Sequence, residues 1–455
     1  MDYLYGMHLR KLIILLALPL FVVAQPTNQW RKAIKNGVQS INSAAAINVD
    51  KTGNVFIAGT THDADSADKL LLIKLDSAGN EKWRRAYQAE NRNHAVAIAM
   101  TVDFAGNSLV TGTVKNRSGN TDIVTLKYSP EGILLWENFF AGKANLFDAP
   151  NAIATDKKGN VLVCGHETVS EANPDLLIIR YTPTGETSFI RNFSTPQMDV
   201  AVDVLADDSC NVYVCGNINV GTRIADIIVM KFDSTGTPQW NYVYDGEQHV
   251  VDIATDFAFD DSTNIFITGS ANHSNDKSDI PVIKINRNGK LMSENLISGG
   301  VADGTGNRIS SSGKNIFLQT SFTDYLQQTV SVSIFKGDKS CKQKKLYNSS
   351  GDISYLKAAG WNNNAVILFG SILSRPENTI APYVEIVDSL NKTTFSMHDD
   401  VLISLLRIKD VLLAGRDIYF LGDDATENAG TISIAKYSFP EPPKKKSKVS
   451  KPNTQ

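Results

Sequence analysis

Aspartates recur in this sequence at a regular step and offer carboxylate groups at equivalent positions of the chain. Two series keep a step of about fifty residues, and they comprise Asp148, Asp199, Asp252 and Asp303, and, with its first member one residue out of step, Asp68, Asp122, Asp175, Asp226 and Asp279. Carboxylates that gather at one point bind a hard cation such as Ca²⁺ or a basic ligand group. Carboxylates at loop ends instead accept hydrogen bonds from backbone N–H groups. The sequence leaves both interpretations open.

These aspartates belong to a repeat that runs through the chain. Its best copies end on a glycine, at Gly59, Gly112, Gly165, Gly216 and Gly269, and they read "DKTGNVFIAG" (50–59), "DFAGNSLVTG" (103–112), "DKKGNVLVCG" (156–165), "DDSCNVYVCG" (207–216) and "DDSTNIFITG" (260–269). Weaker copies at 313–320, 364–370 and 416–422 bring the number of units to eight. A period of about fifty residues is typical of propellers and other repeat architectures.

Each unit is predicted to form four β-strands. An alternating stretch such as "AVAIAMTV" (95–102) leads through a D-x-x-G-N turn into a second strand. A polar loop then precedes an apolar third strand, which closes on a basic residue such as Lys74. The fourth strand carries an aromatic residue at Trp30, Trp83, Trp136, Phe189 and Trp240. Large rings on an outermost strand are expected to cover the seam with the next unit, and an aromatic series for carbohydrate is the alternative.

The two ends of the chain complement each other. "QWRKAI" (29–34) matches "KWRRAY" (82–87), which is a fourth strand, and the last unit stops at Pro440 without a fourth strand of its own. A four-stranded sheet cannot bury both faces alone, whereas a ring of sheets covers every face and leaves no open edge. The sequence therefore predicts an all-β, eight-bladed β-propeller of four-stranded antiparallel blades, one domain over 25–439, closed by residues 29–34 joining the last blade.

Residues outside that domain predict export and a solvated tail. A short basic segment and the apolar run 12–24, followed by Gln25, form a secretory signal peptide over 1–24 with cleavage after Ala24. The mature protein is then secreted, periplasmic or on the cell surface, with no membrane span, because no other segment approaches the roughly 20 apolar residues required. Residues 440–455 are rich in Pro, Lys and Ser and are expected to be disordered. A net charge of −3 gives no reason to expect nucleic acid as a partner.

Four cysteines are scattered along the chain at Cys164, Cys210, Cys215 and Cys341. Two of them stand directly before repeat glycines, where a small buried strand residue is expected. Cys210 and Cys215, five residues apart with no histidine nearby, do not supply the closely spaced ligands of a metal site. Structural or free thiols are the first expectation, and one disulfide is the alternative in an exported chain.

The unit D-x-x-G-N-V-x-V-x-G, followed by V-x-K-x-D-x-x-G-x-x-x-W, resembles the bacterial β-propeller repeat family often called SBBP, found in exported and cell-surface proteins. The resemblance covers nearly the whole mature chain and is closest in the first five units. It weakens in the last three, where Thr320 takes the place of the repeat glycine and Trp361 that of the turn aspartate. It implies the propeller fold and a binding or surface module without a shared chemistry.

The candidate binding residues are expected to lie at one end of the predicted ring. First strands begin, second strands end and third strands begin at that end, and first strands line the centre of a propeller. Asp148, Asp199, Asp252 and Asp303 are therefore expected to crowd the channel mouth, with calcium as the candidate cofactor. The loops between second and third strands vary most between units, so a partner is expected on the same face.

The sequence favours a non-catalytic binding or scaffold module for an envelope protein or glycan, acting as a monomer or as a subunit of a larger assembly. No catalytic residues are assigned, because no nucleophile, zinc-protease or phosphate-binding motif stands out. The alternative is a polysaccharide hydrolase or lyase with its site at the channel mouth. Propeller enzymes assemble such sites from several blades, where a sequence motif would not reveal them.

Overall fold

The computed structural model describes residues 27–439 apart from 36–40, 63–66, 91–92, 171–172, 220–224, 273–276, 299–301, 313–314, 324–327, 337–338, 346–350, 363–364, 375–378, 389–392, 399–406 and 425–429. Only the backbone is described between 321 and 408 and at 41, 312, 315 and 424. The expected signal peptide (1–24), the basic tail (440–455) and the side chain of Cys341 lie outside the described part.

The described residues form strands joined by turns and loops, and they contain no helix long and apolar enough to cross a membrane. The first strands are β2 (Ile41–Val49), β6 (Asn93–Val102), β10 (Ala149–Thr155), β14 (Val200–Ala206), β18 (Asp252–Phe259), β22 (Asp303–Ser312), β26 (Gly351–Asn362) and β30 (Arg407–Ala414). The second strands are β3 (Val55–His62), β7 (Ser108–Lys115), β11 (Val161–Ser170), β15 (Val212–Ile218), β19 (Ile265–Asn272), β23 (Asn315–Thr323), β27 (Ala365–Ser374) and β31 (Asp417–Asp424).

The third strands are β4 (Lys69–Leu75), β8 (Thr121–Tyr128), β12 (Asn173–Tyr181), β16 (Asp226–Phe232), β20 (Ser278–Ile285), β24 (Gln328–Lys336), β28 (Thr379–Asp388) and β32 (Thr431–Ser438). The fourth strands are β1 (Thr27–Ile34), β5 (Glu81–Tyr87), β9 (Leu134–Phe140), β13 (Thr187–Phe193), β17 (Pro238–Tyr244), β21 (Leu291–Ile297), β25 (Lys339–Lys345) and β29 (Thr393–His398).

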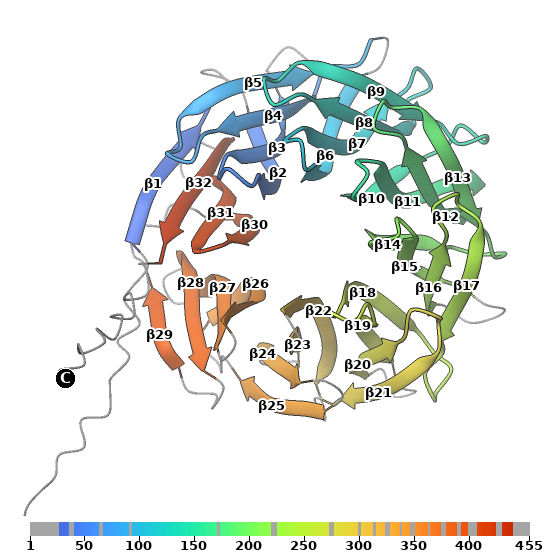
Figure 1. Cartoon of the computed structure of the whole chain (residues 1–455), viewed down its shortest axis with the longest axis vertical. Coiled ribbons are helices and arrows are strands. Elements are labelled where there is room, and N and C mark those ends of the chain that lie inside the picture. Colours follow the sequence, from blue (N-terminus) through green and yellow to red (C-terminus); the bar gives the residue numbers. More distant parts are fainter. Residues whose placement is uncertain are drawn as a thin grey trace, which may run out of the picture.

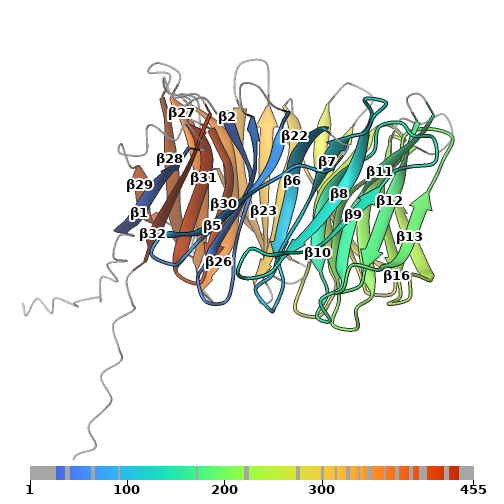
Figure 2. The same cartoon turned by 90° about the horizontal axis from the view of Figure 1, so that it is seen from above.

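Repeated four-stranded antiparallel sheets are built from these strands. From β2 to β29, each sheet takes four consecutive strands in chain order, as in β2-β3-β4-β5 and β14-β15-β16-β17. The sheets stand around a common centre, with the first strands innermost and the fourth strands on the rim (Figure 1). Seen from the side, the strands run across the thickness of the ring, so the connections gather on two opposite faces (Figure 2). This arrangement is a β-propeller, as the repeat predicts.

The N-terminal strand completes the sheet that contains the last strands. β1 pairs antiparallel with β32, in the sheet order β1-β32-β31-β30, so the two ends of the described chain lie side by side (Figure 1). Arg31 lies opposite Ala435, and Ile34 lies opposite Ile432. The predicted closure is confirmed, and the strand begins two residues before the predicted 29–34, at Thr27.

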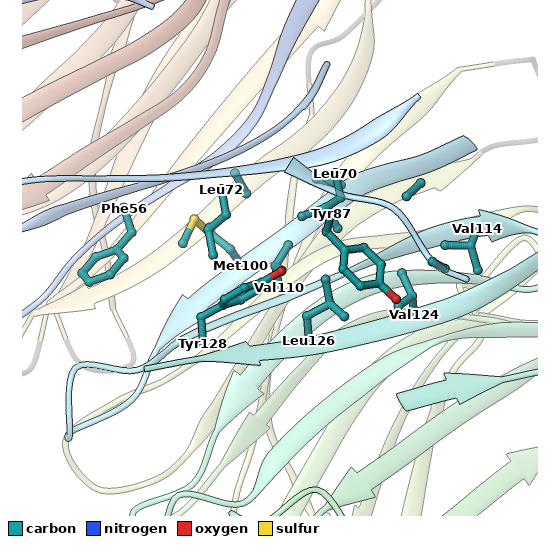
Figure 3. Close-up of a cluster of buried hydrophobic side chains, with 14 of the residues drawn as sticks. Phe56, Leu70, Leu72, Tyr87, Met100, Val110, Val114, Val124, Leu126 and Tyr128 are labelled. Atoms are coloured by element: carbon teal, nitrogen blue, oxygen red, sulfur yellow. The ribbon is translucent and has the colours of Figure 1, made fainter. Parts of the chain in front are cut away.

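Neighbouring sheets cover each other's faces. In β4 all residues from Leu70 to Leu75 are buried, so both faces of this central strand are covered. Figure 3 shows one seam, where Phe56, Leu72 and Tyr87 of the sheet β2–β5 meet Met100 and Tyr128 of the sheet β6–β9. The outer strand β9 instead alternates exposed and partly covered residues, as a strand at the rim should.

The aromatic residues of the fourth strands lie at these seams. Trp83 is 8% exposed, and its Nε1 donates to the carbonyl oxygen of Pro130, in the second turn of the next sheet, at 2.9 Å. A Cβ added to Gly132 in that turn would lie 2.7 Å from the indole. The same contact recurs between Trp30 and Gly79, Trp136 and Gly185, Phe189 and Gly236, and Trp240 and Gly289. Each ring therefore packs on a glycine of the neighbouring sheet.

Buried lysine side chains donate hydrogen bonds to the same turns. Lys127 donates from Nζ to Pro183 O of the next sheet at 3.3 Å and lies 3.1 Å from Asp103, which holds the first turn of its own sheet. The closing sheet repeats this contact across the chain ends. Lys436 Nζ and Trp30 Nε1 both donate to Ser77 O, at 3.3 and 3.0 Å. The seam at the chain ends therefore uses the same groups as the seam where Lys127 and Trp136 both donate to Pro183 O.

The repeat glycines lie within the second strands and face a bulge in the first strands. The pairing shifts by one residue between Ala254, which lies opposite Gly269, and Asp256, which lies opposite Thr268. A Cβ at Gly269 would meet Ile253 O at 1.8 Å, and Gly59, Gly112, Gly165 and Gly216 approach their first strands in the same way. Only glycine permits the backbones to approach this closely at a bulge.

The turn contact predicts a difference between two glycines that both have positive φ. Gly132→Ala should lower the free energy of unfolding by about 3 kcal/mol, because the added methyl group must displace the Trp83 ring. Gly119→Ala should cost only about 1 kcal/mol, since φ is +87° there but no atom of the described residues lies within 4 Å of the new Cβ. Urea unfolding of both variants measures the difference, and equal costs would contradict a role of this contact in stability.

Candidate functional site

The aspartates of the first series lie where the first strands begin, at the end of the ring that we call the loop face. Asp148 and Asp199 directly precede β10 and β14, and Asp252 opens β18. These three side chains are buried. Asp303 opens β22 but is half exposed, 4.0 Å from Lys277 Nζ. The series therefore does not present four equivalent groups.

Two members of this series anchor the loops that precede them. Asp148 Oδ2 accepts a hydrogen bond from Gly142 N at 2.6 Å, and its Oδ1 accepts one from Thr168 N, at the end of the second strand, at 3.1 Å. Asp199 accepts from Thr195 N and from Asn219 N in the same way. These contacts are those expected of loop-end carboxylates.

The aspartates of this series do not form one cluster, as their different carboxylate neighbours show. Asp148 lies near Glu167, and Asp199 near Asp175. Burial, then Asp148 and Asp175, raise the pKa of Glu167, and burial also raises the pKa of Asp148 and Asp199. The part of the loop face around β10–β14 thus carries several carboxylates that oppose each other's ionisation.

Exposed apolar side chains stand beside these anchors. Phe147 and Met198, each directly before an anchoring aspartate, are 56% and 53% exposed. Val169 is also exposed and follows Thr168, whose hydroxyl donates to Phe147 O. Sequence reasoning missed these residues, although their place beside the periodic aspartates is visible in an alignment of the repeats.

A polar hollow lies on the same face. Its volume is about 320 Å³, and its lining includes Glu90, Asn116, Arg117, Asp122 and Asn145. Asn116 Nδ2 donates to Asp122 Oδ1 at 2.9 Å and to Asn145 Oδ1 at 3.0 Å. Amide and carboxylate groups in such a concave position suit a small polar group of a ligand.

The bulges place further charged residues on the innermost strands. Asp256 Oδ2 accepts from Ile309 N of the next sheet at 2.9 Å, and Asp410 Oδ2 accepts from Ile47 N at 3.1 Å. Asp203 occupies the equivalent position in β14, opposite Cys215. Arg308 takes this position in β22. These carboxylates were missed because they are not periodic: the first three repeats have alanine there, at Ala46, Ala99 and Ala152.

Asp203 has the most perturbed environment of this group. Burial, and then the charge of Asp256, raise its pKa to about 7, while Arg308 acts in the opposite direction. Its Oδ1 accepts a hydrogen bond from Val204 N at 2.8 Å. The carboxyl group is surrounded by protein, whereas the residue as a whole is only partly buried. A carboxyl group in this state can hold or release a proton near neutral pH.

The described cysteines are free. Cys164, Cys210 and Cys215 are buried and form no disulfide. Burial raises the pKa of the Cys164 and Cys215 thiols well above its ordinary value, so both stay protonated. The first expectation from the sequence, structural or free thiols, is confirmed for these three residues.

The geometry defines a β-propeller with repeated blades and paired chain ends. No family model matches the sequence, and no curated protein matches it. Among solved structures, Chaetomium thermophilum Sqt1 bound to the N-terminus of the ribosomal protein L10 is similar, with a TM-score of 0.53, 10% identity, and coverage of 90% of this chain and 100% of that chain.

Two further structures are similar at a lower level. The polysaccharide lyase Uly1 has a TM-score of 0.46 and 10% identity, and the match covers 76% of this chain and 90% of that chain. The β-propeller domain of the Trilobed protease from Pyrococcus furiosus, described as having an open velcro topology, has a TM-score of 0.43 and 10% identity, with coverage of 77% and 95%. Similarity at these identities shows the fold alone.

The raised pKa of Asp203 predicts a pH dependence of stability. Its folded-state pKa of about 7 lies above the ordinary value of 3.8, so the folded state binds more protons between these values and stability falls as the pH rises through them. Asp203→Asn should remove this loss, making the variant more stable than the wild type by about 1–3 kcal/mol near pH 8 and little different near pH 4. Urea unfolding over this pH range measures the effect.

Asp410→Asn is the matched control for this experiment, because it removes a hydrogen bond between sheets, from Ile47 N. It should lower stability at every pH in the range. An advantage of Asp203→Asn that does not grow with pH would contradict the assignment.

Proposed function

We propose that this protein is an exported, non-catalytic binding module whose loop face holds a protein partner at the cell envelope. The observation that carries the proposal is the placement of exposed Phe147 and Met198 on connections anchored by buried Asp148 and Asp199. Exposed apolar groups beside carboxylates on a rigid frame suit a partner segment with apolar and basic side chains. A glycan is the other partner that the polar hollow would fit.

The proposed module is a ring of eight blades over residues 25–439, secreted after cleavage near Ala24. The eight copies of the repeat support this count, and the pairing of β1 with β32 supports a single closed domain. The basic residues of 440–455 then form a solvated tail outside the ring.

Comparative capture from envelope extract tests the proposed face. The double variant Phe147→Ser, Met198→Ser should lose at least about tenfold in affinity for the captured partner, since each buried apolar anchor contributes on the order of 1–2 kcal/mol. Both side chains are exposed, so the melting temperature should change little. The captured partner is then purified and its affinity for each variant is measured directly.

Phe104→Ser is the matched control, because Phe104 is 74% exposed in a turn on the opposite face. It should bind the partner like the wild type. Equal losses in the control and the double variant would overturn the proposed face. Loss of capture after periodate treatment of the extract, with protease treatment having no effect, would identify a glycan and overturn the protein partner.

One observation favours a second function, a polysaccharide hydrolase or lyase. A carboxyl group with a pKa of about 7 suits general acid–base catalysis, and Asp203 lies beside Asp256 and Arg308 on the innermost strands. Asp203→Asn should then reduce cleavage of a polysaccharide substrate by about 10²-fold or more, measured by the release of reducing ends. A wild-type protein that cleaves none of a panel of acidic and neutral polysaccharides would contradict this function.

A further inference from the structure

Three carboxylates meet at one seam of the ring. Asp226 opens β16, Asp245 directly follows β17, and Asp252 opens β18, so the group joins the sheet β14–β17 to the sheet β18–β21. One oxygen from each residue lies within 4.8 Å of the others. Asp226 and Asp252 are 1% and 0% exposed. The group combines one member of each periodic series with a third carboxylate from the connection between the sheets.

The Oδ1 atom of Asp252 differs from its counterparts in the two preceding repeats. Asp148 Oδ1 and Asp199 Oδ1 each accept a backbone N–H from the end of the second strand, at 3.1 and 3.0 Å. The corresponding donor for Asp252 would be Asn272 N, which instead donates to Val251 O at 3.0 Å. Asp252 Oδ1 is buried and accepts no hydrogen bond of normal geometry from the described residues, although Asn272 N lies near enough to favour the ionised carboxylate. Its Oδ2 keeps the anchor to Gly246 N at 2.5 Å.

A fully buried carboxylate oxygen without a donor is costly unless another cation or donor reaches it. Burial, and then the charges of Asp226 and Asp245, raise the pKa of Asp252 to about 6, although Gly246 N and the nearby Asn272 N act in the opposite direction. A cation placed among the three carboxylates would reverse this repulsion.

The other seams place different groups beside the aspartate near the start of the third strand. Asp68 is bonded by His62 and His94, Asp122 by Asn116, and Asp175 by the hydroxyl of Ser194. At Asp226 the facing groups include two more carboxylates. The frame is the same at each seam, and the side chains here supply only oxygen ligands.

We propose that Asp226, Asp245 and Asp252 bind one hard divalent cation, Ca²⁺ or Mg²⁺, that links the sheets β14–β17 and β18–β21. Oxygen-only ligand sets suit these cations rather than zinc or copper. His249 Nδ1 lies 2.8 Å from Asp245 Oδ2 and orients this carboxylate from outside the site. The site differs from the predicted channel mouth, because Asp148, Asp199 and Asp303 take no part in it, and it does not depend on the proposed binding function.

Calorimetric titration of the chelator-treated mature protein with CaCl₂ or MgCl₂ tests the site. One cation should bind per chain, and about 10 mM of the bound cation should raise the melting temperature by about 3 °C. Asp226→Asn should weaken binding at least about tenfold and abolish the shift. Asp252→Asn should do the same, but it also weakens a loop anchor, so Asp226→Asn is the more direct test.

Two counterpart variants separate cation binding from general damage to the seams. Asp148→Asn weakens the same kind of loop anchor as Asp252→Asn, and Asp122→Asn changes the same strand position as Asp226→Asn. Both should bind the cation like the wild type. The proposal is overturned if neither cation binds or shifts the melting temperature at about 10 mM, or if Asp226→Asn and Asp122→Asn lose binding equally.

Discussion

The ring depends on a contact in which one turn carbonyl accepts hydrogen bonds from an indole N–H and a buried ammonium group of the preceding sheet. Pro130 O receives Trp83 and Lys74 in this way, at 2.9 Å from each. The next sheet helps to bury this lysine, and the same sheet supplies the turn carbonyl that replaces its lost water, so the burial is compensated at the seam. One junction therefore contains the repeated aspartate, glycine, basic residue and aromatic residue. Its hydrogen bonds form only when two neighbouring sheets are in contact.

The features that this junction requires could be predicted from the sequence. The turn glycines, the basic ends of the third strands and the fourth-strand aromatics recur because the seams that use this junction need them, and the early copy at 29–34 is a fourth strand for the same reason. The candidate site was less predictable. The sequence predicts which end of the sheets Asp148 and Asp252 occupy, but it does not predict which groups lie opposite them across a seam, because these come from a different repeat. The bulge that positions Asp203 is a shift in strand register, which alternation of side chains does not reveal.

Differences between the seams arise on a backbone that hardly changes. The aspartate near the start of the third strand meets two imidazoles at Asp68, an amide at Asp122 and two carboxylates at Asp226. The innermost bulge position likewise changes from Ala152 to Asp203 and then to Arg308. Substitution at positions that the junction does not use can alter the local chemistry while leaving the packing intact. The chemical differences between the seams therefore come from the residues that break the repeat.

The pairing of β1 with β32 joins segments separated by almost the entire length of the domain. Its hydrogen bonds cannot form until the last strand has been synthesised, so the ring closes late and the edge of β32 stays exposed during folding. The same backbone hydrogen bonds satisfy β32 equally well when β1 comes from another molecule. At high concentration during refolding, exchange of this strand between two chains is thus the expected route to a linked dimer.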